Sequence, residues 1–190
     1  MTTRPPIRLR IIGGQWRRRV LQAPALPGLR PTTDRLRETL FNWLMPVISG
    51  ARCCDAFAGT GVLGLEALSR GAASCCFVDA SSAAVCAISE HLISLSAHDK
   101  ARCVTSRFED MSFAKKSIDV LFLDPPFGKG LLEEALQQVD RLGCLSENAM
   151  VYVEYDLASR PTLPEGWFWH RDAKTKRVGY GLLVNSHHVA

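Results

Sequence analysis

Several features that define other classes of protein are missing from these 190 residues. There is no C-x-x-C motif, and the seven cysteines form an odd set with two adjacent pairs, which excludes a disulfide framework and a zinc knuckle. The five histidines show no metal-ligand spacing. No apolar run approaches the roughly 18 residues of a membrane span. We expect a cytoplasmic protein without metal or membrane contact, whose cysteines are small core side chains.

Lysine is absent from the first forty residues, although basic side chains are concentrated there. This segment has nine arginines and only two acids, whereas the net charge of the whole chain is +4, so the basic excess lies here. A guanidinium matches phosphate with a planar fork and stacks on bases, which favours a nucleic-acid partner. A transit peptide or a merely solvated basic face are the alternatives. Gly13, Gly14 and the prolines at 24, 27 and 31 would interrupt the amphipathic helix of a transit peptide.

From about residue 50 onward, short apolar runs alternate with longer amphipathic segments. This alternation predicts a parallel sheet with helices on its faces, a Rossmann-like α/β fold. The expected strands are 52–57, 74–78, 102–105, 118–123 and 149–155, and the expected helices are 62–70, 82–95 and 131–142. The stretch 167–184 predicts an antiparallel pair around the polar turn 172–176, which completes a mostly parallel seven-stranded sheet.

The first fifty residues follow a different pattern. Segments 7–12 and 19–21, separated by Gly13, Gly14 and Gln15, predict a basic hairpin. A helix from about 35 to 45 is expected next, capped by Thr33 or Asp34 and stopped by Pro46. Its apolar residues share one face; they are Leu36, Leu40, Phe41 and Leu44. We therefore expect a small basic unit at 1–48 and an α/β domain at 49–190.

A glycine loop follows the first strand of that domain. Gly59, Gly61 and Gly64 fit the pattern G-x-G-x-x-G, and Asp79 ends the next predicted strand, where an acid can bind ribose hydroxyls. This order favours a cofactor that contains a nucleoside over a purely structural glycine turn.

Asp55, at the end of the same strand, discriminates between such cofactors. A carboxylate there would repel a pyrophosphate but attract the ammonium and sulfonium groups of S-adenosylmethionine. A cap on the following turn is the alternative role for Asp55. The Gly128-Lys129-Gly130 stretch is not a phosphate-binding P-loop, because Leu123 stands where its leading glycine would fall.

The stretch Asp124-Pro125-Pro126-Phe127 follows the strand predicted at 118–123. Two consecutive prolines have fixed φ and no N–H, so they form a stiff extended loop that offers only acceptors. The carboxylate and carbonyls can hold an exocyclic amine while the base stacks on Phe127. Taken alone, the stretch favours a rigid turn that has a capping Asp and a buried Phe, so its context in the sequence must decide.

Together these motifs resemble those of class I S-adenosylmethionine-dependent methyltransferases that modify amino groups. More specifically, the chain resembles the bacterial RsmD family, the 16S rRNA guanine-N2 methyltransferases, almost from end to end. The matching stretches are 10–14 (RIIGG), 30–42 (RPTTDRLRETLFN), 55–61 (DAFAGTG), 124–127 (DPPF) and 176–179 (KRVG). The stretch beginning Arg-Pro-Thr is the most specific to the family, whereas the glycine loop and Asp-Pro-Pro-Phe are shared more widely.

The resemblance implies a role for each matching residue. The catalytic set is Asp124, Pro125, Pro126 and Phe127. The cofactor-binding set is Asp55, Phe57, Gly59, Gly61, Asp79 and Phe108. The resemblance and the arginine-rich start together give the RNA-binding set, which is Arg10, Arg17, Arg18, Arg19, Arg30, Thr32, Lys176 and Arg177. After the third strand the chain reads Ser106-Arg107-Phe108 where many relatives have Asp or Asn, so the amide of Phe108, or a side chain of Glu109 or Asp110, would contact the adenine. For Glu109, a solvated surface charge is the favoured alternative.

The implied partner is 16S rRNA, in the small subunit or an assembly intermediate, bound by a monomer. Three other functions remain open from the sequence: a DNA adenine-N6 or cytosine-N4 methyltransferase, a non-catalytic RNA-binding module on this scaffold, and a dinucleotide oxidoreductase.

Overall fold

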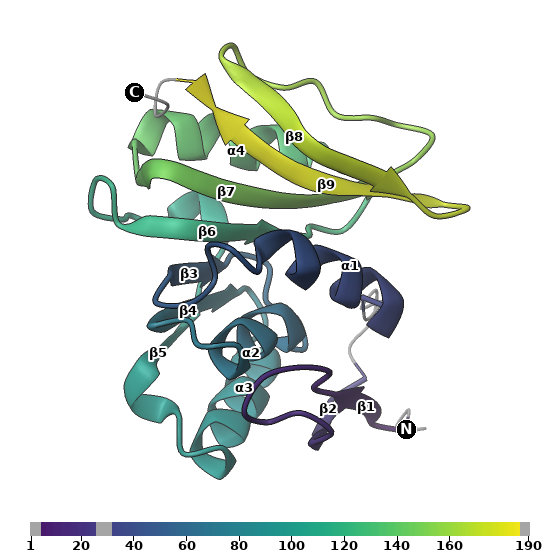
Figure 1. The fold of residues 1–190 in the computed structure, drawn as a ribbon, viewed down its shortest axis with the longest axis vertical. Coiled ribbons are helices and arrows are strands. Elements are labelled where there is room, and N and C mark those ends of the chain that lie inside the picture. Colours follow the sequence, from purple (N-terminus) through teal and green to yellow (C-terminus); the bar gives the residue numbers. More distant parts are fainter. Residues whose placement is uncertain (1–4, 26–31, 187–190) are drawn as a thin grey trace.

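The computed structural model describes residues 5–25 and 32–186, and a seven-stranded sheet dominates it (Figure 1). The strands lie in the order β5-β4-β3-β6-β7-β9-β8. Their bounds are β3 Arg52–Asp55, β4 Ser74–Asp79, β5 Ala101–Thr105, β6 Ile118–Leu123, β7 Leu145–Asp156, β8 Trp167–Lys174 and β9 Val178–Asn185. The first five in this order are parallel, and β9 and β8 add an antiparallel edge. The predicted Rossmann-like class is confirmed.

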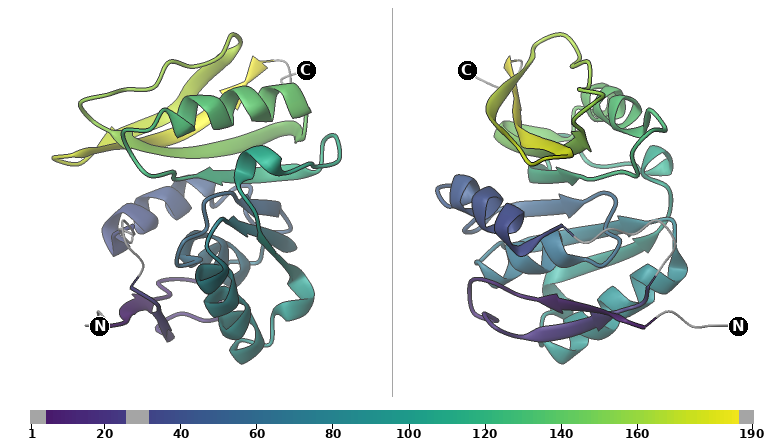
Figure 2. Two further views of the ribbon diagram at one scale, coloured as in Figure 1. Left: turned by 180° about the vertical axis from the view of Figure 1, so that it is seen from behind. Right: turned by 90° about the vertical axis from the view of Figure 1, so that its right-hand side faces the viewer.

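Helices cover both faces of the sheet, as the views in Figure 2 show. On one face lie α1 (Asp34–Leu44), α2 (Val62–Ser69) and α3 (Ser82–Ser94), and their apolar side chains share a core with Phe122 of β6 and Tyr152 of β7. On the other face, α4 (Leu131–Leu142) and the short helix η2 (Phe108–Asp110) pack on the alternate residues of the same strands. A further short helix, η1 (His98–Lys100), leads into β5.

The N-terminal hairpin consists of β1 (Ile7–Arg10) and β2 (Val20–Ala23), and it packs against α2 and α3 rather than joining the main sheet. Every residue of α2 is buried, because the sheet covers one side of the helix and the hairpin loop covers another. An apolar helix of eight residues is stable in this position only when it is covered on all sides. The N-terminal segment is therefore part of the packing of α2.

Most predicted elements agree with the structure to within a few residues, and the differences have local causes. The strand predicted at 52–57 ends at Asp55, whose side chain accepts a hydrogen bond from the start of α2. The polar turn predicted at 172–176 is wrong: β8 continues to Lys174, because Asp172 and Ala173 pair with β9, and the reversal occupies only 175–177. Thr33 is the cap of α1, and the four predicted apolar residues of that helix are buried.

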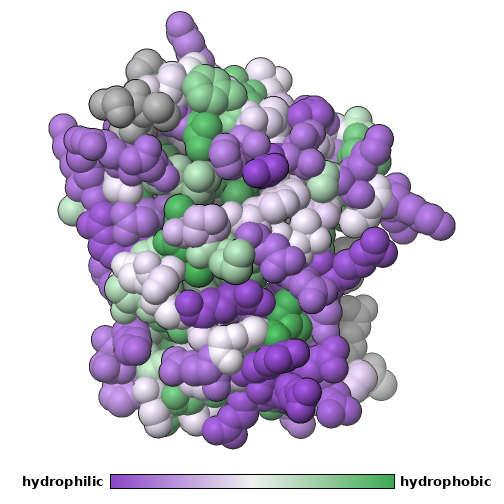
Figure 3. All heavy atoms as spheres, viewed as in Figure 1, coloured by the Kyte–Doolittle hydropathy of each residue, from purple (hydrophilic) through white to green (hydrophobic). Residues whose placement is uncertain are grey.

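Across the described ranges no helix is long and apolar enough to cross a membrane. On the face in Figure 3, hydrophilic residues predominate along the lower rim, where the hairpin lies, and on the projection at the right, which is the tip between β8 and β9. Hydrophilic residues also lie along the left of this face, so hydropathy by itself does not mark out one binding surface.

Candidate active site

The predicted cofactor and catalytic residues meet at the carboxyl edge of the parallel strands. β3 is flanked by β4 on one side and β6 on the other, so the strand order reverses between β3 and β6. Ligands of open α/β sheets bind in the crevice at such a switch point. Asp55 ends β3, Asp79 ends β4, and Asp124 follows β6, so three carboxyl groups stand at the strand ends where such a crevice is expected.

The glycine loop is held by two of these carboxylates. Asp79 accepts hydrogen bonds from the amides of Gly59 at 2.7 Å and Ser81 at 2.8 Å. Asp55 accepts one from the amide of Gly64 at 3.0 Å, so it also acts as the turn cap that the sequence left open. Gly61 begins α2 at φ +76°, a left-handed conformation that favours glycine. The loop is therefore shaped before any ligand is present.

The third glycine allows α2 to approach the sheet closely. A Cβ on Gly64 would lie 2.2 Å from the Phe77 ring and 2.8 Å from the sulfur of Cys75. A side chain at this position would push the helix away from β4, and the start of α2 forms one wall of the crevice. Gly64 thus serves helix packing, while Gly59 and Gly61 shape the loop.

The crevice is strongly acidic. Burial raises the pKa of Asp55 to about 7, with Asp79 adding to the effect and the hydrogen bond from Gly64 opposing it. The pKa of Asp124 is also raised, by burial first and then by the charges of Glu154 and Asp55. Carboxyl groups that raise one another's pKa in this way are stabilised in their charged form by a cation. The site is electrostatically suited to a cationic ligand.

Phe57 and Phe108, both predicted to bind the cofactor, line a cavity of about 290 Å³ beside α4. Their ring centroids are 5.9 Å apart. Gln138 of α4 fixes the η2 segment by donating to the carbonyls of Phe108 and Glu109. Glu109 forms an exposed ion pair with Arg107. The cavity offers flat apolar walls where a planar ring could stack.

Asp124 and Glu154 lie side by side at this edge. Phe122 pairs with Tyr152 and Leu123 with Val153 in the parallel ladder, so the next step of the same register places Asp124 next to Glu154. Glu154 is 6% exposed and accepts hydrogen bonds from Tyr152 at 2.9 Å and Thr32 at 3.0 Å. Thr32, predicted to contact RNA, thus turns its hydroxyl toward a buried carboxyl group.

Asp124, Pro125 and Pro126 follow β6 without regular secondary structure, and a turn begins at Phe127. Pro125 is buried, Pro126 is exposed, and Phe127 is partly exposed. The loop turns back at Gly128, at φ +80°, before α4 begins. Its acceptors and its aromatic ring therefore lie at the mouth of the crevice.

The predicted RNA-binding residues fall into two groups. Lys176 and Arg177 are exposed at the tip between β8 and β9, beyond the carboxyl end of β7, and Arg10 pairs with Asp34 at the start of α1. The other group is the exposed loop that holds Arg17, Arg18 and Arg19.

The loop that holds Arg17, Arg18 and Arg19 lies at the carboxyl end of α2, opposite to the end that follows the glycine loop. The amides of Gln15 and Trp16 bond to Ser69, the last residue of the helix, about 12 Å along its axis from the glycine loop. Arg30 lies outside the described residues. The structure therefore brings one part of the predicted set to the crevice edge and holds the other part away from it.

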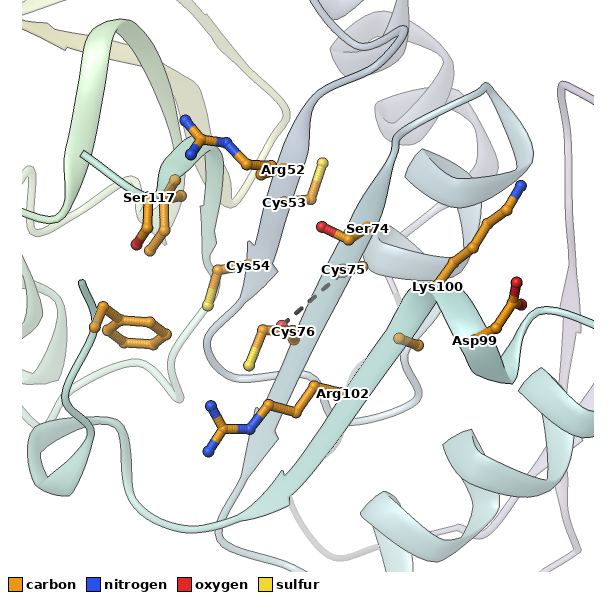
Figure 4. Close-up of a pocket in the computed structure, with 13 residues that line it drawn as sticks. Arg52, Cys53, Cys54, Ser74, Cys75, Cys76, Asp99, Lys100, Arg102 and Ser117 are labelled. Carbon is orange, nitrogen blue, oxygen red and sulfur yellow. Dashed lines mark hydrogen bonds between the residues drawn. The ribbon is translucent and has the colours of Figure 1, made fainter. Parts of the chain in front are cut away.

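A second cavity, of about 340 Å³, lies at the amino ends of β3, β4 and β5 (Figure 4). Cys54, Cys76 and Arg102 are among the residues that line it. This end of the sheet is opposite to the crevice, so the larger cavity is separate from the candidate active site. The expectation that all cysteines are core residues is wrong for Cys86, which is exposed, and the cysteines of the chain are all free.

Sequence reasoning missed Glu154 and Tyr152. The signal was present, because Glu154 is the only charged residue in the run 149–155 and stands near its carboxyl end. A buried acid in an otherwise apolar strand requires partners. Within the described ranges, no group of three or more His, Cys, Asp or Glu side chains is arranged to hold a metal ion.

The sheet order, the glycine loop after β3 and the acceptor loop after β6 define a methyltransferase of the Rossmann-like class. The model of the family described as "Conserved hypothetical protein 95" matches residues 9–184. The chain belongs to this family, which is the RsmD family.

Named relatives agree with this assignment. Ribosomal RNA small subunit methyltransferase D of Escherichia coli K12 is 48% identical over 92% of this chain and 88% of its own. The protein of the same name from Haemophilus influenzae is 38% identical over 93% and 94%. The solved structure of the Escherichia coli protein yhhF, described as a methyltransferase, has a TM-score of 0.83 at 45% identity and covers 94% and 98% of the two chains.

Proposed function

We propose that this protein transfers the methyl group of S-adenosylmethionine to the exocyclic N2 of a guanine in 16S rRNA. The observation that carries the proposal is the acidic crevice between β3 and β6, bordered by a loop that offers only acceptors and an aromatic ring. Membership of the family, and relatives named as small-subunit rRNA methyltransferases, support the choice of polymer.

The cofactor assignment rests on charge and shape. The ammonium and sulfonium of S-adenosylmethionine would lie near Asp55, Gly59 and Gly61, and Asp79 would bind the ribose. Asp79 already uses one lone pair of each oxygen for the loop, and each oxygen retains another for a hydroxyl donor. The adenine would occupy the cavity between Phe57 and Phe108. A dinucleotide would bring its pyrophosphate against Asp55, which is unfavourable.

The chemistry follows from the acceptors at Asp124 and Pro125. The lone pair of the guanine amine is delocalised into the ring, so the nitrogen is a poor nucleophile until its hydrogens are held. The Asp124 side chain and the Pro125 carbonyl would hold them, and Phe127 would stack on the base. The sulfonium methyl is already activated when the cofactor is bound. Alignment of nitrogen, methyl and sulfur then supplies much of the acceleration, and such effects reach roughly 7 to 11 kcal/mol.

The RNA would approach across the carboxyl edge. The proposed RNA surface starts at this edge of the catalytic domain at 49–190, with Arg10, Lys176 and Arg177. The Arg17–Arg19 loop of the basic unit at 1–48 would extend it away from the crevice. Phosphate contacts of this kind position the RNA without reading its sequence. The target guanine must be extruded or unpaired, because pairing otherwise occupies its amine. A monomer in the cytoplasm meets these requirements.

The test uses small subunits from cells that lack this protein. Incubation with the purified enzyme and S-adenosylmethionine should produce one new N2-methylguanosine in 16S rRNA, measured by nucleoside mass spectrometry. Duplex DNA serves as the competing substrate. Methylation of adenine or cytosine in DNA, with the guanines of the rRNA unchanged, would contradict the proposal.

Replacing Asp124 separates binding from chemistry. Asp124→Ala should retain S-adenosylmethionine binding by calorimetry and lose at least about a hundredfold in methylation rate, because the amine loses its acceptor. Asp99→Ala, an exposed acid in η1 at the opposite edge of the sheet, is the matched control and should leave the rate unchanged. A normal rate for Asp124→Ala would remove this residue from the mechanism.

A further inference from the structure

The two adjacent cysteine pairs of the sequence stand in register on neighbouring strands. Cys53 pairs with Cys75, and Cys54 with Cys76, in the parallel ladder between β3 and β4. Successive residues of a strand point to opposite faces of the sheet, so the two ladder pairs lie on opposite faces. The Cys53–Cys75 pair belongs to the core that contains α2, and the Cys54–Cys76 pair belongs to the core that contains α4. The sheet therefore carries two dithiol pairs with the same ladder register.

These two pairs differ in what covers them. Cys75 is 1% exposed, and its sulfur lies so close to α2 that a Cβ on Gly64 would come within 2.8 Å of it. Cys76, in contrast, is partly exposed, and together with Cys54 it lines the cavity of about 340 Å³. In Figure 4 the side chains of Cys54 and Cys76 point the same way, and that of Cys53 points the opposite way. Of the two pairs, the one in the cavity is open to a reagent in solution.

The spacing of neighbouring strands suits a bond between the sulfurs of Cys54 and Cys76. Strands of a sheet lie about 4.8 Å apart, and disulfides join Cα atoms that are usually roughly 4.4 to 6.8 Å apart. Cys54 and Cys76 are direct ladder partners on one face of the sheet, and both are free thiols. A disulfide between them leaves the order and register of the strands unchanged.

The cavity has an excess of positive charge. Its lining contains the basic residues Arg52, Lys100 and Arg102 and one acid, Asp99. Arg52 is held in an ion pair, whereas Lys100 and Arg102 take part in none of the ion pairs of the described residues, and both are exposed. Arg102 is also the ladder partner of Cys76 on β5. An anionic reagent is therefore attracted to the side of Cys76.

The two thiols of the cavity are not equivalent. The neighbouring thiol of Cys54 lowers the pKa of Cys76, and Arg102 adds to this effect while burial opposes it. The pKa of Cys54 is raised by its contact with Cys76 and by burial. Because the thiolate is the nucleophile in disulfide chemistry, Cys76 is the residue suited to attack first.

We propose that Cys54 and Cys76 form a thiol–disulfide exchange site for anionic low-molecular-weight disulfides such as glutathione disulfide. The Cys76 thiolate attacks one sulfur of the small disulfide, the sulfur–sulfur bond breaks, and one small thiolate leaves and is protonated by solvent. Cys54 then attacks the sulfur of Cys76, and the second small thiolate leaves with the proton of Cys54. Two protein thiols are oxidised to one disulfide, and the small disulfide is reduced to two thiols.

The new bond would close the segment 54–76, which contains the glycine loop and the whole of α2. A closed segment has fewer unfolded conformations, so the oxidised protein should unfold at a higher urea concentration than the reduced protein. Reduction should reverse the shift, and Cys76→Ser should not show it. Equal midpoints for the oxidised and reduced wild type would contradict the closure of this segment.

Mass spectrometry tests where the bond forms. The purified full-length protein carries Cys86→Ser, which removes an exposed thiol outside the cavity. After incubation with glutathione disulfide, the remaining thiols are alkylated, and the tryptic peptides 53–70 and 71–100 should be joined by a disulfide. The link should be lost in Cys54→Ala and in Cys76→Ala. Unlinked peptides with alkylated Cys54 and Cys76 would overturn the proposal.

The pair on the other face of the sheet is the matched control, because it has the same ladder register and is covered by α2. Cys53→Ala and Cys75→Ala should therefore keep the link. A link that depends on Cys53 or Cys75, or that runs through any other cysteine, would overturn the proposal. Because Cys76 is partly exposed, Cys76→Ser keeps the test decisive even if a substitution at the buried Cys54 does not fold.

The order of the two steps and the role of charge have separate readouts. Cys54→Ala should stop at a glutathione adduct on Cys76, whereas Cys76→Ala should form no adduct on Cys54; the reverse result would contradict the assigned roles. Arg102→Gln should slow the reaction with glutathione disulfide more than the reaction with the uncharged 2-hydroxyethyl disulfide. Arg107→Gln, an exposed arginine outside the cavity lining, should change neither rate. An unchanged rate with glutathione disulfide in Arg102→Gln would reject the preference for anionic disulfides.

Discussion

At the scale of single residues, the carboxyl group of Asp55 has a structural role in addition to its proposed role in ligand binding. Asp55 is 2% exposed and caps the start of α2, yet it also faces the position proposed for the cationic end of the cofactor. A buried acid with one backbone donor is not fully compensated, so its ionised form depends on what binds beside it. The proposed cofactor would therefore supply charge compensation that the protein alone lacks.

The raised pKa of Asp55 predicts how the stability of the folded protein and its affinity for S-adenosylmethionine depend on pH. The pKa of Asp55 in the folded protein is about 7, above the ordinary value of 3.8. The stability that this residue contributes is therefore fully present below about pH 4 and is lost as the pH rises through 7. A cation favours the ionised form, so the affinity for S-adenosylmethionine should rise between about pH 6 and 8, with proton release on binding. Calorimetry in buffers of different ionisation enthalpy measures both effects.

The control for this prediction is Asp55→Asn, which keeps an acceptor for the Gly64 amide and cannot titrate. Its affinity should be lower and nearly independent of pH. An equal rise in affinity for wild type and variant would assign the titration to another group.

At the scale of elements, α2 depends on a buried ionic network with the N-terminal segment. Glu66 is fully buried and accepts hydrogen bonds from the Ile12 amide, Arg37 and Arg70. Arg37 of α1 is 2% exposed and also donates to the carbonyl of Arg10. The Glu66 side chain thus joins α1, α2 and the hairpin. It fixes the N-terminal unit against α2, the helix that follows the glycine loop.

Removal of the Glu66 carboxylate should lower the free energy of unfolding substantially. Glu66→Ala takes from the buried Arg37 guanidinium one of its two carboxylate partners, the other being the more exposed Asp34, and breaking a buried ion pair costs on the order of 3 to 5 kcal/mol. Denaturant unfolding should show this loss, and trypsin should cleave the Arg17–Arg19 loop faster. Glu38→Ala, an exposed acid of α1, should change the free energy of unfolding by less than about 0.5 kcal/mol. A loss below 1 kcal/mol for Glu66→Ala would contradict the network's importance.

At the scale of the whole molecule, the surface is divided by the direction of the parallel strands. Their carboxyl edge bears the acidic crevice, with Lys176 and Arg177 projecting beyond it. Their amino edge bears the cysteine-lined cavity and the exposed Lys115 and Lys116. The charge of +4 alone does not show which basic residues would contact RNA, but their position relative to the crevice makes Lys176 and Arg177 the better candidates.

Salt dependence tests this division. Lys176→Gln with Arg177→Gln should weaken RNA binding and reduce the slope of log affinity against log salt by roughly 1 to 2, because two phosphate contacts are lost. Lys115→Gln with Lys116→Gln removes the same charge at the opposite edge. Binding titrations across salt concentrations should leave the slope of this control unchanged; equal slopes in both variants would contradict an RNA surface at the carboxyl edge.

The sequence alone determined the elements, their order, and the two loops that border the crevice. These features depend on local patterns: apolar periodicity, glycines where φ is positive, and prolines that forbid a strand. Only the tertiary structure decided that Thr32 meets Glu154, that Glu66 joins three elements, and that Arg17–Arg19 lie at the far end of α2. Such contacts depend on strand register and helix packing between residues far apart in the chain, which local patterns do not encode.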